Sequence, residues 1–248
     1  MSTIIFYDLT SALPEKVWSP NTWKVRYCLN YKALPYKTEW VEFPDIEAHC
    51  KKLGIPPTSV EADGTPAYTL PALHDPATGT YIADSLLIAE YLEKTYPTPS
   101  IFPHGTAAFQ ALFDGALRKA ALGPLWPFII PAVHTRLAPA SAAYFRTTRE
   151  PIFGKALEEV TPTGAEGVAQ WAAFEAGLDT VDKWYAKSGG PFIMGDTTSW
   201  ADFIVGSWLI WLRTIWGEGS QQWKDVASWH GGRWAKVLGD LEEYQKVD

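Results

Sequence analysis

The sequence predicts an α/β unit over residues 1–96, a linker over 97–106 and an all-helical unit over 107–248. Three observations predict this organisation. Short apolar runs alternate with helix-like periodicity in the first part, a proline-dense stretch follows, and helical periodicity continues to the end. The chain has 248 residues, of which 47% are hydrophobic, and this is enough for a substantial core in one large or two small domains.

The first half of the α/β unit has the pattern of a βαβ motif. We expect buried strands at residues 3–9 and 36–43, because both are short runs rich in apolar and β-branched residues. Between them, residues 20–32 are predicted to be helical, with Val25, Cys28 and Leu29 on one face. The segment 44–66 mixes charged residues with Gly and Pro, so we expect a mobile connection there with a short helix near 46–53.

The second half of this unit has a ββα pattern. Residues 71–74 and 81–84 flank a turn at 75–79, as expected for a hairpin, and residues 85–96 are predicted to close the unit as a helix.

The helical unit is predicted to contain helices at 142–159, 166–188, 199–216 and 233–244. Prolines at 124, 127 and 131 should kink or break the first long helix after the linker. Ser199 and Asp202 have the spacing of a capping box, so we assign them to folding rather than to chemistry.

Composition excludes several classes of function. The chain has 21 basic and 28 acidic residues, a formal net charge of −7, and no basic run, so binding to nucleic acid is not expected. The longest uncharged stretches, 120–133 and 203–212, are shorter than the roughly 20 residues that span a bilayer. The start of the sequence is unlike a secretory leader, and two cysteines do not make a disulfide framework, so we expect a reducing, cytoplasmic location. The five histidines lack metal-ligand spacing, and no metal is predicted.

Three local motifs indicate where chemistry takes place. Ser19 and Pro20 form a helix-start signal directly behind the first strand, and a helix N-terminus favours anions, a thiolate among them. The alternative interpretation of Ser19 is a plain helix cap. Pro71 stands at the mouth of a short strand, where its peptide bond is a candidate for the cis form. Asp84 and Ser85 mark a second helix start, which has a capping pair as its alternative explanation.

In this order, the three motifs resemble the glutathione S-transferase superfamily. That family has a catalytic residue at the start of the first helix of a thioredoxin-like domain, a cis-proline and an acidic-Ser pair. Residues 195–202 are similar to the family's capping motif ahead of a buried helix, so the resemblance covers most of the chain. Among subclasses, residues 18–24 and the Trp-rich second half are most similar to the fungal-specific FuA class, which is related to etherases.

The resemblance implies a glutathione site made by a defined set of residues. Ser19 would donate a hydrogen bond to the sulfur of glutathione, and Asn21 or Thr22 would supply a second donor. The main chain of Leu70, before Pro71, would pair with the tripeptide. Asp84 would hold the γ-glutamyl ammonium and Ser85 the γ-glutamyl carboxylate. The cations considered for the glycyl carboxylate are in the connection, namely His49, Lys51 and Lys52.

The pKa of the glutathione thiol determines how much stabilisation Ser19 and the helix end would have to supply. A free thiol has a pKa near 8.5, so lowering that pKa by roughly two units requires about 2.7 kcal/mol of preferential stabilisation of the thiolate. One charge-assisted hydrogen bond and a helix dipole are of sufficient size. Ser19 would act as a donor and not as a nucleophile. Because Ser19 and Thr22 stand where redox relatives carry Cys-x-x-Cys or a single Cys, cysteine-type thiol transfer is disfavoured.

The second substrate is expected to be an apolar or aromatic compound. The chain has 13 Trp, 11 Tyr and 11 Phe, and a cleft between the two units would stack flat rings. A hydroxyl or imidazole, from Tyr7 or His134, could polarise an electrophile. The substrate contacts considered are Tyr7, Trp18, Trp23, Trp126, Phe128, His134, Trp208 and Trp211.

Three functions therefore compete. The leading hypothesis is a glutathione transferase that conjugates the thiolate to aromatic compounds, or uses it to cleave a β-aryl ether of wood-derived phenolics. The second is a ligandin that sequesters aromatic compounds with little turnover. The third is a structural or regulatory subunit that does not bind glutathione, as superfamily members in translation and nitrogen signalling are. The resemblance also implies a homodimer.

Overall fold

The computed structural model describes residues 2–248, and its α/β part is built on a mixed four-stranded sheet. The strand order is β2-β1-β5-β6, in which β1 and β2 run parallel and the other neighbours are antiparallel. The strands are β1 (Ile4–Leu9), β2 (Tyr36–Val41), β5 (Ala72–Asp75) and β6 (Thr80–Ala83). Parallel strands need a crossover, and α1 (Pro20–Tyr31) supplies it.

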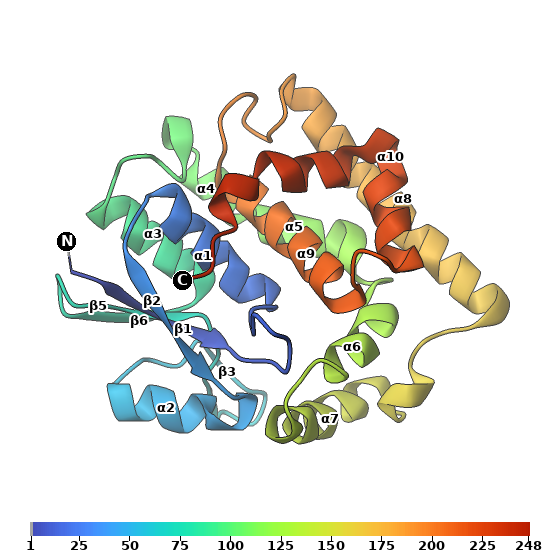
Figure 1. Cartoon of the computed structure of the whole chain (residues 1–248), viewed down its shortest axis with the longest axis horizontal. Helices are drawn as coiled ribbons and strands as arrows, with labels where there is room; N and C mark the ends of the chain where they lie inside the picture. The colour runs from blue at the N-terminus through green and yellow to red at the C-terminus, as the bar shows by residue number, and fades with distance from the viewer. Residues whose placement is uncertain (1) are drawn as a thin grey trace.

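Helices cover both faces of this sheet (Figure 1). α1 packs beside α3 (Ser85–Thr95) on one face, while α2 (Ile46–Leu53) lies on the other. This arrangement is the predicted thioredoxin-like domain. The segment 44–66, predicted as a mobile connection with a short helix near 46–53, contains that helix as α2. It also contains a two-stranded ribbon, β3 (Ser59–Val60) with β4 (Pro66–Ala67), which is too short to give a periodic signal.

Everything after this domain is helical, as predicted. The helices are α4 (Ala107–Ala111), α5 (Phe113–Leu117), a π-helical turn (Arg118–Leu122), α6 (Trp126–His134), α7 (Pro139–Phe153), α8 (Gly164–Ser188), α9 (Trp200–Trp216) and α10 (Gln221–Asp240). Single 3₁₀ turns occur at Phe43–Asp45, Pro103–Gly105, Leu157–Glu159 and Glu242–Tyr244. Regular helix is interrupted at residues 123–125, near the prolines predicted to break it, although Gly123 and Leu125 keep helical backbone angles and Pro131 is accommodated inside α6.

Two predicted helix boundaries are wrong by more than five residues. α7 ends at Phe153 and not at residue 159, because Gly154 adopts a left-handed conformation with φ of 68°. The last helix starts at Gln221, twelve residues before the predicted start, because the hydroxyl of Ser220 accepts a hydrogen bond from the amide of Trp223 and caps it. This helix is interrupted at residues 229–232, where positive φ angles at His230 and two following glycines break its periodicity.

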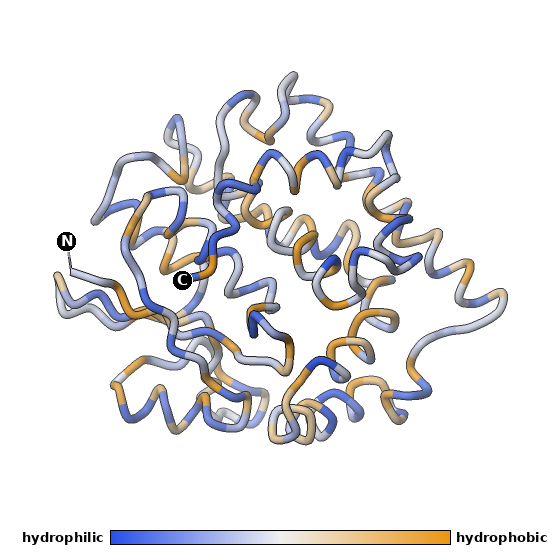
Figure 2. Tube along the Cα trace, viewed as in Figure 1, coloured by the Kyte–Doolittle hydropathy of each residue, from blue (hydrophilic) through white to orange (hydrophobic). Residues whose placement is uncertain are grey.

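α9 runs through the centre of the molecule and joins the two parts. Its apolar residues form much of the core (Figure 2). The predicted capping box is present, since the Asp202 carboxylate accepts hydrogen bonds from both the amide and the hydroxyl of Ser199. Phe203 stacks on Tyr27 of α1 with ring centroids 5.5 Å apart. Gly206 allows close packing at this point, because a Cβ there would lie 2.6 Å from Cδ1 of Leu241 and 3.3 Å from the Tyr27 ring.

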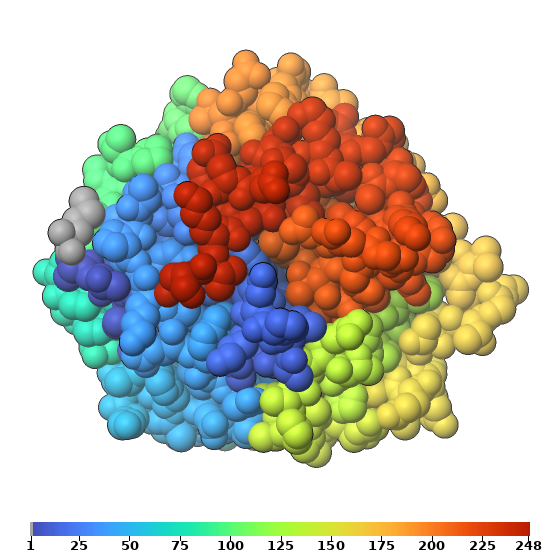
Figure 3. Space-filling model, viewed as in Figure 1, coloured from blue at the N-terminus to red at the C-terminus, as the bar shows by residue number. Residues whose placement is uncertain are grey.

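The last residues of the chain lie against the α/β domain (Figures 1 and 3). The Asp248 carboxylate accepts a hydrogen bond of 2.7 Å from the amide of Thr38 in β2. It also lies 3.4 Å from Arg26, a fully buried residue of α1 whose guanidinium pairs at 2.8 Å with Asp8. The C-terminal residues therefore add to the contact between the helical part and the sheet.

Candidate active site

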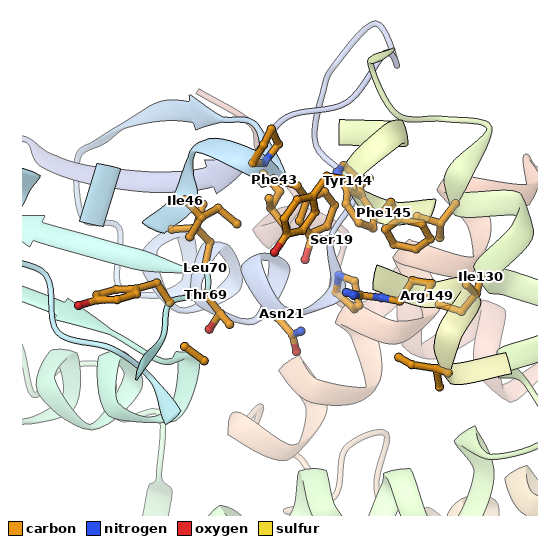
Figure 4. Close-up of a pocket in the computed structure, with 18 of the residues that line it drawn as sticks. Ser19, Asn21, Phe43, Ile46, Thr69, Leu70, Ile130, Tyr144, Phe145 and Arg149 are labelled. Carbon is orange, nitrogen blue, oxygen red and sulfur yellow. The ribbon is translucent and has the colours of Figure 1, made fainter. Parts of the chain in front are cut away.

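A cleft of about 770 Å³ lies where the two parts of the chain meet. The loop before α1, the segment from Phe43 into α2, and the strand-connecting residues 65–70 form one wall. The helical part forms the other wall through α6, α7 and α9 together with the π-helical turn. Figure 4 shows Ser19 near the middle of this cleft, with Leu70 on one side and Arg149 on the other.

Ser19 occupies the N-cap position of α1, but its hydroxyl does not cap the helix. It makes no capping hydrogen bond, and among residues 2–248 no other partner of this hydroxyl is found. The residue is only 3% exposed, and it lines the cleft. Pro20 follows at the first helical position, and the amides of the first turn lack intrahelical partners. The hydroxyl and the positive end of α1 can therefore both act on a group in the cleft.

The two neighbouring candidate donors that the sequence left open are placed differently in the structure. Thr22 is fully buried, does not line the cleft, and donates its hydroxyl to the carbonyl of Ser19 at 3.0 Å. Asn21 does line the cleft, and its side-chain oxygen accepts hydrogen bonds from Lys24 and Arg118, both at 3.2 Å. Because two cations hold the oxygen, the amide nitrogen of Asn21 is left to donate elsewhere.

A charged network fixes this part of α1 against the helical part. Lys24, which is 2% exposed, pairs with Asp114 at 2.9 Å, and Asp114 pairs with Arg118 at 2.7 Å. Burial lowers the pKa of the Lys24 ammonium, and Asp114 acts against that shift. Burial tends to raise the pKa of Asp114, but the two neighbouring cations outweigh it and the net shift is downward. The carboxylate therefore stays ionised between the two cations that hold Asn21.

The loop at Pro71 follows the predicted geometry. The Leu70–Pro71 peptide bond is cis, and Leu70 lines the cleft. Asp84 lies beside this bond, since its amide donates to the carbonyl of Pro71 at 3.3 Å. Its carboxylate caps α3 by accepting from the amides at positions 86 and 87. Asp84 and Ser85 thus stand next to the loop without lining the cleft itself.

Three tryptophans form an aromatic surface on the helical wall. Trp126 of α6 lies 5.7 Å from Trp208 and 6.1 Å from Trp211 between ring centroids, and the last two are 5.2 Å apart. The indole N–H groups of Trp208 and Trp211 are buried and have no hydrogen-bond partner within residues 2–248. On the opposite wall, Trp18 packs against Phe43 at 6.0 Å. Of the five tryptophans predicted as substrate contacts, these four line the cleft and Trp23 does not.

Other predicted site residues do not line the cleft. Tyr7 lies in β1 with its ring 4.9 Å from His49, and burial raises the pKa of its hydroxyl to about 12. Trp23 packs against Tyr27 of the same helix, α1, with ring centroids 5.6 Å apart. Sequence periodicity alone does not distinguish a residue that lines the cleft from one that packs in the core. Phe128, which packs on Trp171, also lies outside the cleft lining, as do His134, His49, Lys52 and Pro71.

Sequence reasoning missed several residues of the cleft. Phe43 and Tyr144 stack with ring centroids 6.0 Å apart, and Phe145 and Arg149 come from the same helix α7. Arg118 lies over the Trp208 ring, 4.9 Å from its centroid. A helix presents only one side to a cleft, and the sequence does not say which side of α7 faces the sheet.

Neither cysteine is placed for chemistry. Cys28 and Cys50 are both buried, and burial raises the pKa of each thiol. Within the described residues, 2–248, no group of three His, Cys, Asp or Glu side chains is arranged to hold a metal ion. In the same range, no helix combines the length and apolar character needed to cross a bilayer.

Comparison with known proteins agrees with this geometry. A family model described as the glutathione S-transferase N-terminal domain matches residues 18–95, and one described as the C-terminal domain matches residues 108–244. The chain belongs to the glutathione S-transferase family. This confirms the sequence-based assignment to that family, its fold and its class of enzyme, in which glutathione is the co-substrate.

The most informative relatives of this glutathione S-transferase are fungal. It is 33% identical to the glutathione S-transferase-like protein ustS of Aspergillus flavus over 98% of this chain and 95% of that protein. A glutathione S-transferase of Ceriporiopsis subvermispora, crystallised in complex with glutathione, is 45% identical and superposes with a TM-score of 0.94, covering 100% of this chain and 99% of the other. Glutathione transferase GSTFuA3 from Phanerochaete chrysosporium is also 45% identical, with a TM-score of 0.92 and the same coverage. These matches support the predicted similarity to the FuA class.

Proposed function

We propose that this glutathione S-transferase activates bound glutathione through Ser19 and transfers the thiolate to hydrophobic aromatic compounds. One observation carries the proposal. Ser19, at the N-cap of α1, makes no capping hydrogen bond with its hydroxyl, and the residue lines the cleft. A capping serine normally bonds an amide of the first turn. Here the hydroxyl is available to donate to an anion held at the positive end of α1.

The proposed mechanism is the preferential stabilisation of a thiolate. Ser19 donates its O–H to the sulfur, and the side-chain amide of Asn21 donates a second hydrogen bond. The cations Lys24 and Arg118 keep the Asn21 oxygen turned away from the sulfur. Two charge-assisted hydrogen bonds and a helix end are together sufficient for the roughly 2.7 kcal/mol that a shift of two pKa units requires.

The rest of glutathione is proposed to lie along the wall of the α/β domain. The main chain of Leu70, which precedes the first paired residue of β5, would bond the cysteinyl backbone in antiparallel fashion. The γ-glutamyl group would reach Ser85 and the free oxygen of Asp84, whose other oxygen caps α3. We make no assignment for the glycyl carboxylate, because neither His49 nor Lys52 lines the cleft.

The aromatic surface supports the choice of second substrate. The tryptophan rings of the helical wall offer flat faces on which an aromatic compound can stack. Conjugation is the simplest reaction, in which the sulfur displaces a leaving group from an activated carbon. Cleavage of a β-aryl ether by the same thiolate is the variant that the FuA similarity suggests for phenolic fragments of wood.

Two accompanying proposals concern the state of the protein. Three exposed apolar side chains support the two-fold dimer expected in this family, namely Leu87 on α3, Phe109 on α4 and Leu112 between α4 and α5. Free, buried cysteines agree with a reducing cytoplasm. Sedimentation in solution and localisation of the tagged chain test these two proposals.

The central experiment compares turnover by wild type, Ser19→Ala and Ser19→Thr with glutathione and a chloronitrobenzene electrophile. Loss of one charge-assisted hydrogen bond should reduce kcat/KM by about 10- to 100-fold in Ser19→Ala, whereas Ser19→Thr, which retains a hydroxyl, should keep part of the rate. Equal rates in wild type and Ser19→Ala would refute the mechanism.

A ligandin remains the competing function. The same tryptophans would then bind aromatic compounds tightly while the chain turns over none of a panel of electrophiles. Calorimetric binding of a phenolic compound, measured beside its turnover with glutathione, separates the two functions.

A further inference from the structure

Arg149 is a cation without an anionic partner in the cleft. It lies on α7, one turn after Phe145, and its guanidinium is 5.0 Å from that ring (Figure 4). Its side chain makes one hydrogen bond, of 3.0 Å, to the hydroxyl of Thr148. Within residues 2–248 it forms no ion pair, so most of its five N–H donors are uncommitted. The residue is half-buried, and burial lowers the pKa of its guanidinium.

The neighbouring arginines of the helical part are already satisfied. Arg118, the other cation on this wall, is paired with Asp114 and bonded to Asn21. Arg146, one turn before Arg149 on the same helix, is paired with Glu150 and Glu158 and does not line the cleft. Arg149 therefore differs from both in lacking an acid.

No carboxylate of the helical wall offsets this charge. Apart from the hydroxyl of Tyr144 and the two arginines, that wall is made of apolar and aromatic side chains. The acids in the cleft lining, Glu47 and Glu61, are exposed residues of the α/β domain, and Glu47 already pairs with Lys51. An aromatic surface and an unpaired planar cation thus share one side of the cleft.

We infer that the second substrate of this transferase is an aromatic carboxylate, whose ring stacks on the tryptophan surface and whose carboxylate binds Arg149. This inference rests on the proposed function and makes its substrate class specific. A guanidinium matches the two oxygens of a carboxylate in a bidentate pair. A pair shielded from water on one side by Phe145 is stronger than one on an open surface.

The inference is tested with two electrophiles of similar shape, the anionic 4-chloro-3-nitrobenzoate and the neutral 4-chloro-3-nitrobenzamide. In both, the glutathione thiolate forms a C–S bond at the carbon that bears chlorine, the C–Cl bond breaks, and chloride leaves with the electron pair. The measured quantity is the ratio of kcat/KM for the acid to kcat/KM for the amide. Dividing the ratio of a variant by that of wild type cancels the intrinsic reactivity of the two rings.

Removing the cation should remove the preference for the acid. In Arg149→Gln the ratio is expected to fall by about tenfold or more, the size of one charge-assisted hydrogen bond. Arg149→Lys keeps the charge without the bidentate geometry, so its acid-to-amide ratio should lie between the ratios of Arg149→Gln and wild type. Arg146→Gln is the matched control, because it removes an arginine one turn away outside the cleft, and it should keep the wild-type ratio.

The outcomes separate this inference from the proposed function. An unchanged ratio in Arg149→Gln overturns the inference while leaving Ser19-dependent turnover intact. A raised KM for glutathione in Arg149→Gln with an unchanged ratio also overturns it, because Arg149 would then hold the glycyl carboxylate of glutathione. Absence of turnover of both electrophiles by wild type, with glutathione bound, would instead refute the proposed transferase mechanism.

Discussion

Asn21 offers the sharpest test of how the sulfur would be activated. Its side-chain oxygen is held by Lys24 and Arg118, so only its amide nitrogen is free to face the cleft. Asn21→Ala removes that donor and leaves Ser19 and the helix end in place. If a charge-assisted hydrogen bond contributes about 1.5 kcal/mol, its loss raises the thiol pKa of bound glutathione by about one unit.

The expected rate follows from this shift. If the thiol pKa in the wild-type complex is about 6.5, half of the sulfur is ionised at that pH, and after a rise of one unit about a tenth remains. The rate at pH 6.5 should fall about fivefold and recover as the pH rises above the new pKa. Asn21→Asp should raise the thiol pKa further, because it replaces a donor with a negative charge near the thiolate.

The assay is an ultraviolet difference titration of the thiolate of bound glutathione, run beside the pH profile of kcat. Thr22→Val serves as the control, because the Thr22 hydroxyl donates its hydrogen bond to the carbonyl of Ser19 and Thr22 does not line the cleft. It should leave the thiol pKa at its wild-type value. An unchanged thiol pKa in Asn21→Ala, or a larger shift in Thr22→Val, would refute the reasoning.

Three further predictions concern the rest of the chain. Burial raises the pKa of Asp202 to about 6 from the ordinary 3.8, so the native state keeps a proton that the unfolded chain loses. The stability of wild type relative to Asp202→Asn should therefore fall by up to about 3 kcal/mol as the pH rises from 4 to above 6 in denaturant titrations; a flat difference would contradict this. Cys28 and Cys50 should react with a thiol reagent only after unfolding, and rapid labelling of the native protein would be inconsistent with their burial. Arg26→Met leaves the Asp8 carboxylate buried and unpaired, and should cost about 3–5 kcal/mol of unfolding free energy, whereas a loss below 1 kcal/mol would show that the pair adds little.

The sequence predicted those features of the site that are encoded locally. The helix start at Ser19 and Pro20, the cis bond at Pro71 and the helix start at Asp84 each depend on a few adjacent residues. They were therefore recognisable in order along the chain.

Features that depend on distant segments were not predictable in this way. The choice between Asn21 and Thr22 rests on Arg118, which is far away in sequence and reaches α1 only after the helical part has packed. Arg149 was missed because its position in the cleft lining depends on which side of α7 faces the sheet. The start of the last helix was misplaced because two glycines and His230 interrupt its periodicity.

The contact at Gly206 has a consequence for how such enzymes diversify. Tyr27 and Phe203 stack where that glycine brings α9 against the back of α1, so the helix that presents Ser19 is seated directly on the helical part. Opening a hinge between the two parts would separate this stack. New substrate specificities should therefore arise by exchanging single side chains on α6 and α7, while the residues around Ser19 stay the same.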